Sequence, residues 1–425
     1  MTAKIEVVFT LSFLMGLCLC LTNCTPVPSS PTAVSPVPVF TEQPPATAMP
    51  TATSAPLSTQ TLQPSLLDTP ARQSTVLTDG VVAVITHDTL ALVTLAEGSP
   101  HPLLEAPLPT YTHLRFDWSP AGSQIVYGRL ADLWLVDVES RRTRNLTNTP
   151  DRWELLPSWS PNGKMVAFTS RPLDPREYGV TEGTLYAGFG GQLTLIQADG
   201  SDYRVVDEQG PALSSTPSWS PDSKHLVYAA GGSLYIYDLG QGQRQGVTLS
   251  DYGLPANFYA CAPSWSPQED EIALLFSTRS EPGDTSVEKG YAILNLTDHT
   301  SRVLKRYTLT DTMAYEGISA GEHIGGCTQF PALWSPRGDY LLLRIMTIPR
   351  TNRQSSLSVI DAQGGQERAL AGIYGAYQAD WSPDGKWVVY VDNGERSLNV
   401  VNPFDPDERY QILRPLCCSG VAWRP

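Results

Sequence analysis

The chain repeats a ten-residue phrase, and this repeat constrains the fold more than any other feature of the sequence. The clearest copy runs from Trp381 to Tyr390, where a Trp-Ser-Pro-Asp-Gly turn is followed by an apolar run. An aromatic residue ends one strand, proline presets φ for the turn, and glycine supplies the positive φ that closes a short hairpin loop. The phrase therefore predicts two antiparallel strands joined by a tight turn.

Six copies of the phrase share a Trp-Ser-Pro start, and their tryptophans are Trp118, Trp159, Trp219, Trp265, Trp334 and Trp381. The copies at Trp219 and Trp265 lack the glycine, which leaves a different turn open for them. An apolar second strand, a third strand and a shorter fourth strand follow each copy. Four short strands in a unit of roughly 40–45 residues are typical of a β-propeller blade. The wider spacings after Trp159 and Trp265 indicate that two blades carry insertions.

The two ends of the chain complete the count of blades. Residues 81–104 read as second, third and fourth strands with no first strand before them. Residues 421–425 read as a first strand with nothing after it. We therefore predict an all-β fold, a seven-bladed β-propeller closed by pairing the C-terminal strand with the N-terminal blade. Such closure removes aggregation-prone sheet edges.

The Trp-Ser-Pro-Asp/Asn-Gly phrase with its apolar strand resembles the WD40-like repeat of the TolB-type propeller family. The resemblance covers roughly residues 76–425. It implies the propeller fold and is weak evidence for function. TolB has six blades and an additional N-terminal domain, whereas this chain shows seven blades and no such domain. A role in the Tol-Pal system is therefore not carried over.

Residues 1–23 are predicted to be a lipoprotein signal peptide. The apolar run that ends at Leu21 is shorter than the roughly 20 residues of a membrane span. The residues from Leu21 to Cys24 resemble a bacterial lipobox, which makes Cys24 the predicted lipidated residue. Cys20 and Cys18 are alternative acylation sites, and an ordinary secretory signal peptide is the alternative for the whole segment.

Residues 24–75 are predicted to be a disordered tether, because more than half of residues 25–75 are Pro, Ser or Thr. Such a composition cannot bury a core and favours an extended chain. A glycosylated stalk is the alternative. The segments together predict an exported protein, periplasmic or on the cell surface, that contacts the membrane only through its lipid anchor.

Charge and motifs exclude several functions. The formal net charge of -14 argues against nucleic-acid binding, which requires basic patches. The segment Gly317–Gly321 matches G-x-S-x-G but falls in a propeller loop without the strand-to-helix turn of a hydrolase. The segment Gly188–Gly191 resembles a phosphate loop but precedes a strand. The histidines show no metal-ligand spacing, so we predict no catalytic residue, metal or cofactor.

Four cysteines follow the tether, and all are disulfide candidates: Cys261, Cys327, Cys417 and Cys418. They are expected on one face of the ring, in loops that lead into the first strands of three consecutive blades. Export permits disulfides. Cys261–Cys327 is the preferred pair, while Cys417 can pair with Cys418, or either of them with Cys327. A zinc site lacks the usual ligand spacing.

The same face collects the longest loops and their aromatic residues. One insertion contains Tyr178 and another contains His323, and Trp153, Tyr259 and Tyr377 are expected in loops that lead into first strands. Aromatic residues around a propeller mouth can bind a peptide, a glycan or a protein. The alternative is that they pack the long loops onto the ring.

Two functions from different classes follow. The first is a non-enzymatic binding module for an envelope or extracellular protein, peptide or glycan. The second is an enzyme acting on a polysaccharide or peptide, with Arg152, Glu154, Glu322 and His323 as candidate groups in the central funnel. The lack of an ordered histidine cluster favours binding. A third possibility, a structural spacer, predicts no pocket.

Overall fold

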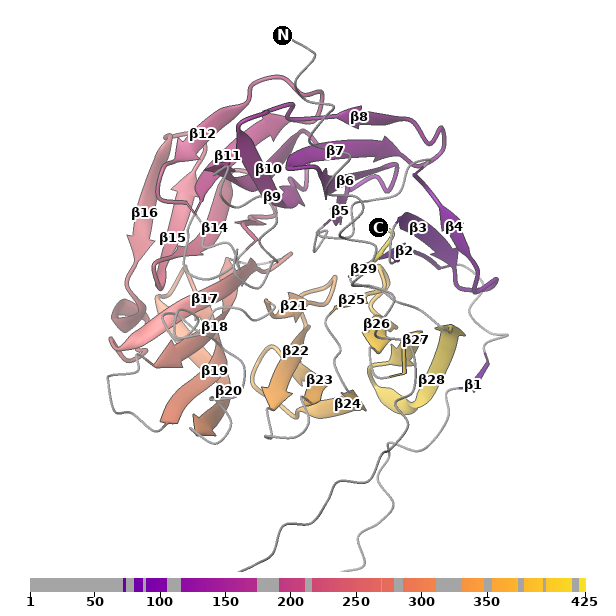
Figure 1. Ribbon diagram of the computed structural model, residues 1–425. Coiled ribbons are helices and arrows are strands. Elements are labelled where there is room, and N and C mark those ends of the chain that lie inside the picture. The colour runs from indigo at the N-terminus through magenta and orange to yellow at the C-terminus, as the bar shows by residue number, and fades with distance from the viewer. Residues whose placement is uncertain are drawn as a thin grey trace, which may run out of the picture. The chain divides into compact units, whose positions relative to one another are not determined.

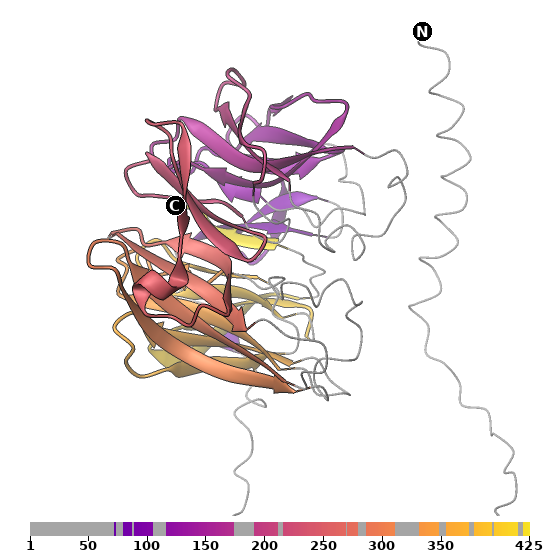
Figure 2. The same ribbon diagram turned by 90° about the vertical axis from the view of Figure 1, so that its left-hand side faces the viewer.

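Seven blades, each built on four antiparallel strands, surround a central axis in the computed structural model (Figures 1 and 2). The structure describes residues 72–73, 80–86, 89–104, 116–173, 191–210, 216–268, 270–278, 286–310, 331–347, 354–373, 378–392, 395–414 and 420–425. All of these lie in one unit, Leu62–Pro425. The predicted seven-bladed β-propeller is confirmed.

Each blade consists of four strands, of which the innermost comes first and the outermost last. The first blade contains β29 (Gly420–Trp423), β2 (Val81–Ile85), β3 (Leu90–Thr94) and β4 (Pro100–Pro102), and the second contains β5 (Phe116–Trp118), β6 (Gln124–Arg129), β7 (Asp132–Asp137) and β8 (Thr143–Asn145). The third blade contains β9 (Arg152–Trp159), β10 (Met165–Pro172), β11 (Gln192–Gln197) and β12 (Arg204–Asp207). The fourth contains β13 (Ser218–Trp219), β14 (His225–Ala230), β15 (Ser233–Asp238) and β16 (Gln243–Val247). The fifth blade contains β17 (Phe258–Trp265), β18 (Glu271–Thr278), β19 (Ser286–Asn295) and β20 (Thr300–Thr310). The sixth contains β21 (Leu333–Trp334), β22 (Tyr340–Thr347), β23 (Gln354–Asp361) and β24 (Arg368–Ile373). The seventh contains β25 (Ala379–Trp381), β26 (Val388–Asp392), β27 (Ser397–Asn402) and β28 (Asp405–Leu413).

The C-terminal strand closes the ring. β29 pairs antiparallel with β2, with Val421 opposite Val84, and Figure 1 shows these two strands side by side. A further short strand, β1 (Arg72–Gln73), pairs in parallel with β28, with Arg72 opposite Tyr410. These two residues fall within the range predicted to be a tether, so the end of that range adds a fifth strand to the last blade.

The hydrophobic core lies between the blades. One cluster joins Val82 and Val93 of the closing blade to Val389 and Leu398 of the blade before it. Another joins the β17–β20 blade to the β21–β24 blade. Alternate residues of each strand face one neighbouring blade or the other, so strands buried on both faces read as apolar runs. Not every outer strand is short, because β20 pairs along the whole length of β19.

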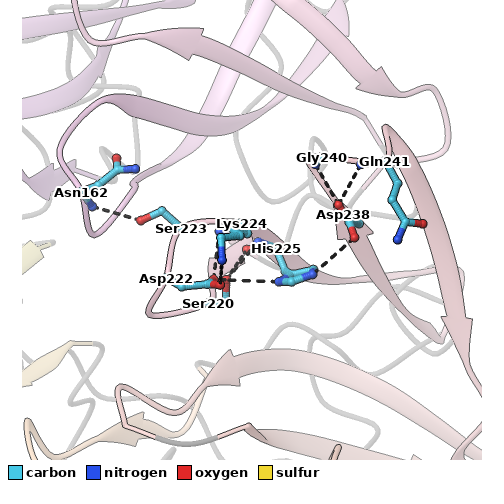
Figure 3. Close-up of polar contacts among 9 residues, drawn as sticks. All are labelled: Asn162, Ser220, Asp222, Ser223, Lys224, His225, Asp238, Gly240 and Gln241. Atoms are coloured by element: carbon cyan, nitrogen blue, oxygen red, sulfur yellow. Dashed lines mark hydrogen bonds and ion pairs between the residues drawn. The ribbon is translucent and has the colours of Figure 1, made fainter.

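A serine side chain organises the repeated turn. In the fourth blade the Ser220 hydroxyl donates to Asp222 Oδ1 over 2.7 Å and accepts the backbone N–H of His225 over 2.9 Å (Figure 3). Asp222 Oδ1 also accepts the Lys224 backbone N–H over 3.0 Å. The backbone N–H of Asn162, in the corresponding turn of the preceding blade, donates to Ser223 Oγ over 3.1 Å. This turn is thus fixed internally and linked to the turn of the preceding blade.

Other copies of the phrase use the same serine bond. In four of them the serine hydroxyl oxygen accepts the backbone N–H five residues later at 2.9–3.0 Å, at Ser119, Ser160, Ser335 and Ser382. The glycine position has positive φ, 71° at Gly385. Ser223 occupies it with a φ of 61°, so the copy at Trp219 forms the same turn without glycine. A non-glycine residue reaches this region at a steric cost, which the hydrogen bonds of the turn offset.

The two faces of the ring carry different connections. The motif face carries the turns between first and second and between third and fourth strands, and the loop face carries the others. On the loop face the Glu154 backbone N–H donates to the Ala131 carbonyl over 2.8 Å, and that of Ala260 to the Gly232 carbonyl over 2.9 Å. These turns between second and third strands therefore lie beside the start of the next blade.

Helical structure is sparse in the described part of the chain. The 3-10 helix η3 (Leu249–Tyr252) connects the β13–β16 blade to the β17–β20 blade. No helix within the described ranges is long and apolar enough to cross a membrane.

Replacing Ser382 with alanine should lower the free energy of unfolding by about 1–3 kcal/mol, because the Trp387 N–H loses its acceptor at a buried serine. Urea unfolding measures the difference. Asp384→Asn is the matched control and should cost much less, because Asn162 has the same role in another blade. Equal destabilisation by both changes would contradict the role given to the serine.

Candidate functional site

A cavity of about 210 Å³ lies at the axis, between the innermost strands of four consecutive blades, β21, β25, β29 and β5. Most of its walls are apolar. It is lined by Phe116, Asp117, Pro331, Leu333, Leu342, Arg344, Leu357, Gln378, Ala379, Asp380, Val421 and Ala422. The ring thus brings polar groups from three blades into a small apolar space.

Two aspartates of this cavity link neighbouring blades. Each precedes the tryptophan of its repeat. Asp117 Oδ2 accepts the backbone N–H of Trp159 over 2.7 Å, and Asp380 Oδ2 accepts that of Trp423 over 2.8 Å. Asp380 Oδ1 also accepts the N–H of Trp381 over 2.9 Å. The carboxylates therefore bind the first strand of the following blade.

Burial raises the pKa of both carboxyl groups. The pKa of Asp117 rises to about 7, mainly because the cavity wall removes water from it, while the hydrogen bonds from Trp159 and Trp118 lower it in part. The pKa of Asp380 rises to about 6 for the same reason, against the bonds from Trp423 and Trp381. The negative charge of Asp380 adds to the upward shift at Asp117.

Two further polar side chains line the cavity. Gln378 Oε1 accepts the Val421 backbone N–H over 2.9 Å, which joins β25 to β29. Arg344, on β22, is 7% exposed, and its carbonyl accepts the Tyr291 hydroxyl over 2.8 Å. Arg344 adds a cationic residue to the lining of this cavity.

Arg152 and Glu154 lie in a separate cluster inside the β9–β12 blade and do not line the central cavity. Glu154 is 1% exposed, and its Oε1 accepts hydrogen bonds from Thr149 at 2.7 Å, Tyr203 at 3.1 Å and Ser170 at 3.3 Å. Burial raises its pKa to about 7. Arg152 Nε donates to the same Ser170 over 2.6 Å. The pair holds strands of one blade together.

Trp153 and Tyr259 lie in the first strands β9 and β17, not in the preceding loops as expected. The strands start early because β10 and β18 extend beside them, with Arg171 opposite Trp153 and Ser277 opposite Tyr259. A Cβ atom added to Gly232 would lie 1.9 Å from the Tyr259 ring. Tyr259 therefore packs on the turn of the preceding blade. One whole blade, β13–β16, separates the two aromatic residues along the ring.

Cys261 is buried in β17 and forms a disulfide, again within the strand rather than the loop before it. Its partner lies outside the described residues, so the Cys261–Cys327 pairing stays a prediction. The other predicted residues outside the described ranges are Cys24, Tyr178, Glu322, His323, Cys327, Tyr377, Cys417, Cys418 and the Gly317–Gly321 motif.

Sequence reasoning missed Asp117, Asp380 and Arg344. A signal existed for the aspartates, since both immediately precede a repeat tryptophan on the innermost strand of their blade. Within the described ranges, no group of three or more His, Cys, Asp or Glu residues is placed to hold a metal ion.

Comparison with known proteins gives partial matches. No protein-family model matches the sequence. The chain is 28% identical over 236 residues to the Tol-Pal system protein TolB of Francisella tularensis subsp. holarctica (strain OSU18), a match that covers 51% of this chain and 46% of that protein. The chain thus spans about half the length of the TolB relatives it matches.

Two further proteins are similar over different extents. Dipeptidyl-peptidase 5 of Porphyromonas gingivalis is 26% identical over 149 residues, which is 32% of this chain and 20% of that protein. The periplasmic gluconolactonase PpgL of Pseudomonas aeruginosa, a solved structure, has a TM-score of 0.50 and 15% identity, and covers 81% of this chain and 99% of that one. This likeness concerns the fold alone.

The raised pKa of Asp117 predicts that stability falls as the pH rises. Between roughly pH 4 and pH 7 the folded state keeps a proton that the unfolded chain releases, so the free energy of unfolding decreases across this window. In Asp117→Asn the free energy of unfolding should fall by about 2–4 kcal/mol less across this window than in the wild type, while the asparagine keeps an acceptor for Trp159.

Urea unfolding at pH 4.5 and pH 7.5 measures this effect. Asp380→Asn should have a smaller effect on the pH dependence of stability, because the pKa of Asp380 is raised only to about 6. An Asp117→Asn protein as sensitive to pH as the wild type would refute the assignment.

Proposed function

Because the chain carries a TolB-type propeller, we propose that it is an exported, lipid-anchored binding module whose central cavity receives part of a protein or peptide partner. The cavity's size carries this proposal. Small-molecule sites usually enclose about 300–1,000 Å³, whereas this cavity measures about 210 Å³. A mostly apolar space of that size suits one inserted side chain or chain end.

The bonds of the acidic groups favour binding over catalysis. Both oxygens of Asp380 accept backbone N–H groups, and Asp117 Oδ2 accepts another. Abstracting a proton would compete with the bonds that join the blades. The aspartates and Arg344 are better suited to orient a polar or charged group at the end of an inserted side chain.

An enzyme acting on a polysaccharide or peptide in the central funnel is the second candidate. The observation that favours it is the pKa of about 7 at Asp117 beside that of about 6 at Asp380, since acid–base catalysts titrate near the working pH. A similar protein named as a dipeptidyl-peptidase adds to this candidate.

Export and anchoring rest on the N-terminal residues and on one disulfide. Residues 1–23 are the proposed signal peptide, Cys24 the acylated residue and residues 24–75 the tether. The disulfide of Cys261 supports an oxidising compartment. Trp153, Tyr178, Tyr259, His323 and Tyr377 are the further partner contacts proposed on the loop face.

Filling the central cavity tests the proposed function. Peptides selected from a displayed library on the full-length protein should bind the variant Ala379→Leu about tenfold more weakly or worse, because the larger side chain occupies the cavity. Isothermal titration calorimetry measures the affinities. Ala230→Leu, a partly buried alanine on β14 outside the cavity, is the matched control and should bind as the wild type does.

Unchanged affinity in a folded Ala379→Leu protein would place the peptide elsewhere and reject the cavity as the site. Cleavage of the bound peptides, followed by mass spectrometry and lost in Asp117→Asn, would favour the enzyme instead.

A further inference from the structure

A polar cleft of about 340 Å³ lies on the motif face, between the β17–β20 blade and the β21–β24 blade. None of its lining residues belongs to the central cavity. Its walls come from two consecutive repeat turns and from the turn between β23 and β24. The side chains that matter here are Gln268, Glu271, Arg337, Tyr340, Asp361 and Gln363.

The floor and sides of this cleft are fixed by hydrogen bonds. Glu271 forms a two-point ion pair with Arg302, with both N–O distances 2.8 Å, and Arg302 Nε donates to the Ala362 carbonyl over 3.1 Å. Gln268 Nε2 donates across the cleft to the Pro336 carbonyl over 3.3 Å. The two blades therefore hold the cleft open in a defined shape.

An aromatic pair stands beside the cleft. The ring of Tyr340, which lines it, meets the ring of Phe404 edge to face, with centroids 5.0 Å apart. Phe404 comes from the β27–β28 turn of the next blade and is 43% exposed, high for a large apolar side chain. Arg368 lies 5.7 Å from its ring centre. An exposed ring fixed in this way is a platform for a flat or weakly apolar ligand face.

The cleft also offers hydrogen-bonding groups that the fold does not use. Among the described residues, neither the Tyr340 hydroxyl nor the Gln363 side-chain amide has a partner. Asp361 Oδ1 caps the Gln363 backbone N–H over 2.7 Å, and Arg337 and Asp339 form an exposed pair 3.3 Å apart. Hydroxyl, amide, carboxylate and guanidinium groups together both donate and accept.

We propose that this cleft binds a neutral saccharide, a site and ligand beyond the function proposed above. Sugar hydroxyls both donate and accept hydrogen bonds, and the C–H face of a sugar ring packs on aromatic side chains. An anionic ligand would meet Asp339 and Asp361 against the exposed Arg337, since Arg302 already compensates the charge of Glu271. A bound metal ion lacks a set of three ligands within the described ranges. The volume lies within the usual range of small-ligand sites.

Titration calorimetry of the full-length protein with maltotriose, cellotriose and triacetylchitotriose tests the proposal, with trigalacturonate as the acidic counterpart. At least one neutral saccharide should bind. Gln363→Ala and Phe404→Ala should each weaken that binding about tenfold, because one removes a hydrogen bond and the other the aromatic platform.

The matched control is Gln241→Ala. Gln241 lies in the corresponding turn after β15, drawn in Figure 3, on a blade away from the cleft. This variant should bind as the wild type does. The proposal fails if no neutral saccharide binds, if trigalacturonate binds more tightly, or if Gln241→Ala weakens binding as much as Gln363→Ala. The cavity-filling variant Ala379→Leu should leave saccharide binding intact, which separates this site from the central one.

Discussion

The contact between each innermost strand and its neighbouring blade is the constraint on which the rest of the structure depends. A four-stranded sheet cannot bury both faces alone, so every blade requires two neighbours. The residues of the repeat form hydrogen bonds to the preceding blade and to the following blade. The Trp381 indole donates back to the Leu333 carbonyl over 3.0 Å, and Asp117 accepts forward from the Trp159 N–H over 2.7 Å. The tryptophan thus provides apolar bulk between blades and a polar link near the axis, which fixes both spacing and register.

Ring closure uses the same links as the interior of the ring. β29 is far in sequence from β2, yet its Trp423 N–H reaches Asp380 over 2.8 Å, and its Ala422 carbonyl accepts the Trp118 indole N–H over 3.4 Å. The closing blade is therefore held like any other, at both its neighbours. The short strand β1 then covers part of the outer edge of β28, where an uncovered edge would invite pairing with another chain.

The sequence predicted the blades well because their signals are local. Turn residues and apolar alternation act within about ten residues, so Trp381–Tyr390 defines a hairpin wherever it lies. The central cavity needed information of another kind. Asp117, Asp380 and Arg344 line one cavity only because closure brings four blades around one axis. The start of β9 was also missed, because Trp153 becomes part of that strand only by pairing with Arg171 in an extended β10. Pairing between strands depends on residues that are distant in the sequence, whereas turn formation depends on residues next to one another.

The two proposed sites differ in how many of their polar groups already form hydrogen bonds within the fold. At the axis Asp380 and Gln378 are occupied by backbone bonds between blades, so a partner there gains mostly from apolar contact and from charge. In the motif-face cleft the Glu271–Arg302 pair, the Gln268 bond to Pro336 and the Asp361 cap are structural. The Tyr340 hydroxyl and the Gln363 side-chain amide have no partner among the described residues. Both sites include residues of the β21–β24 blade but share no lining residue, and β1 joins the ring at the outer edge of β28 rather than at either site. The proposed protein site at the axis and the proposed saccharide site between two blades can therefore be occupied at the same time.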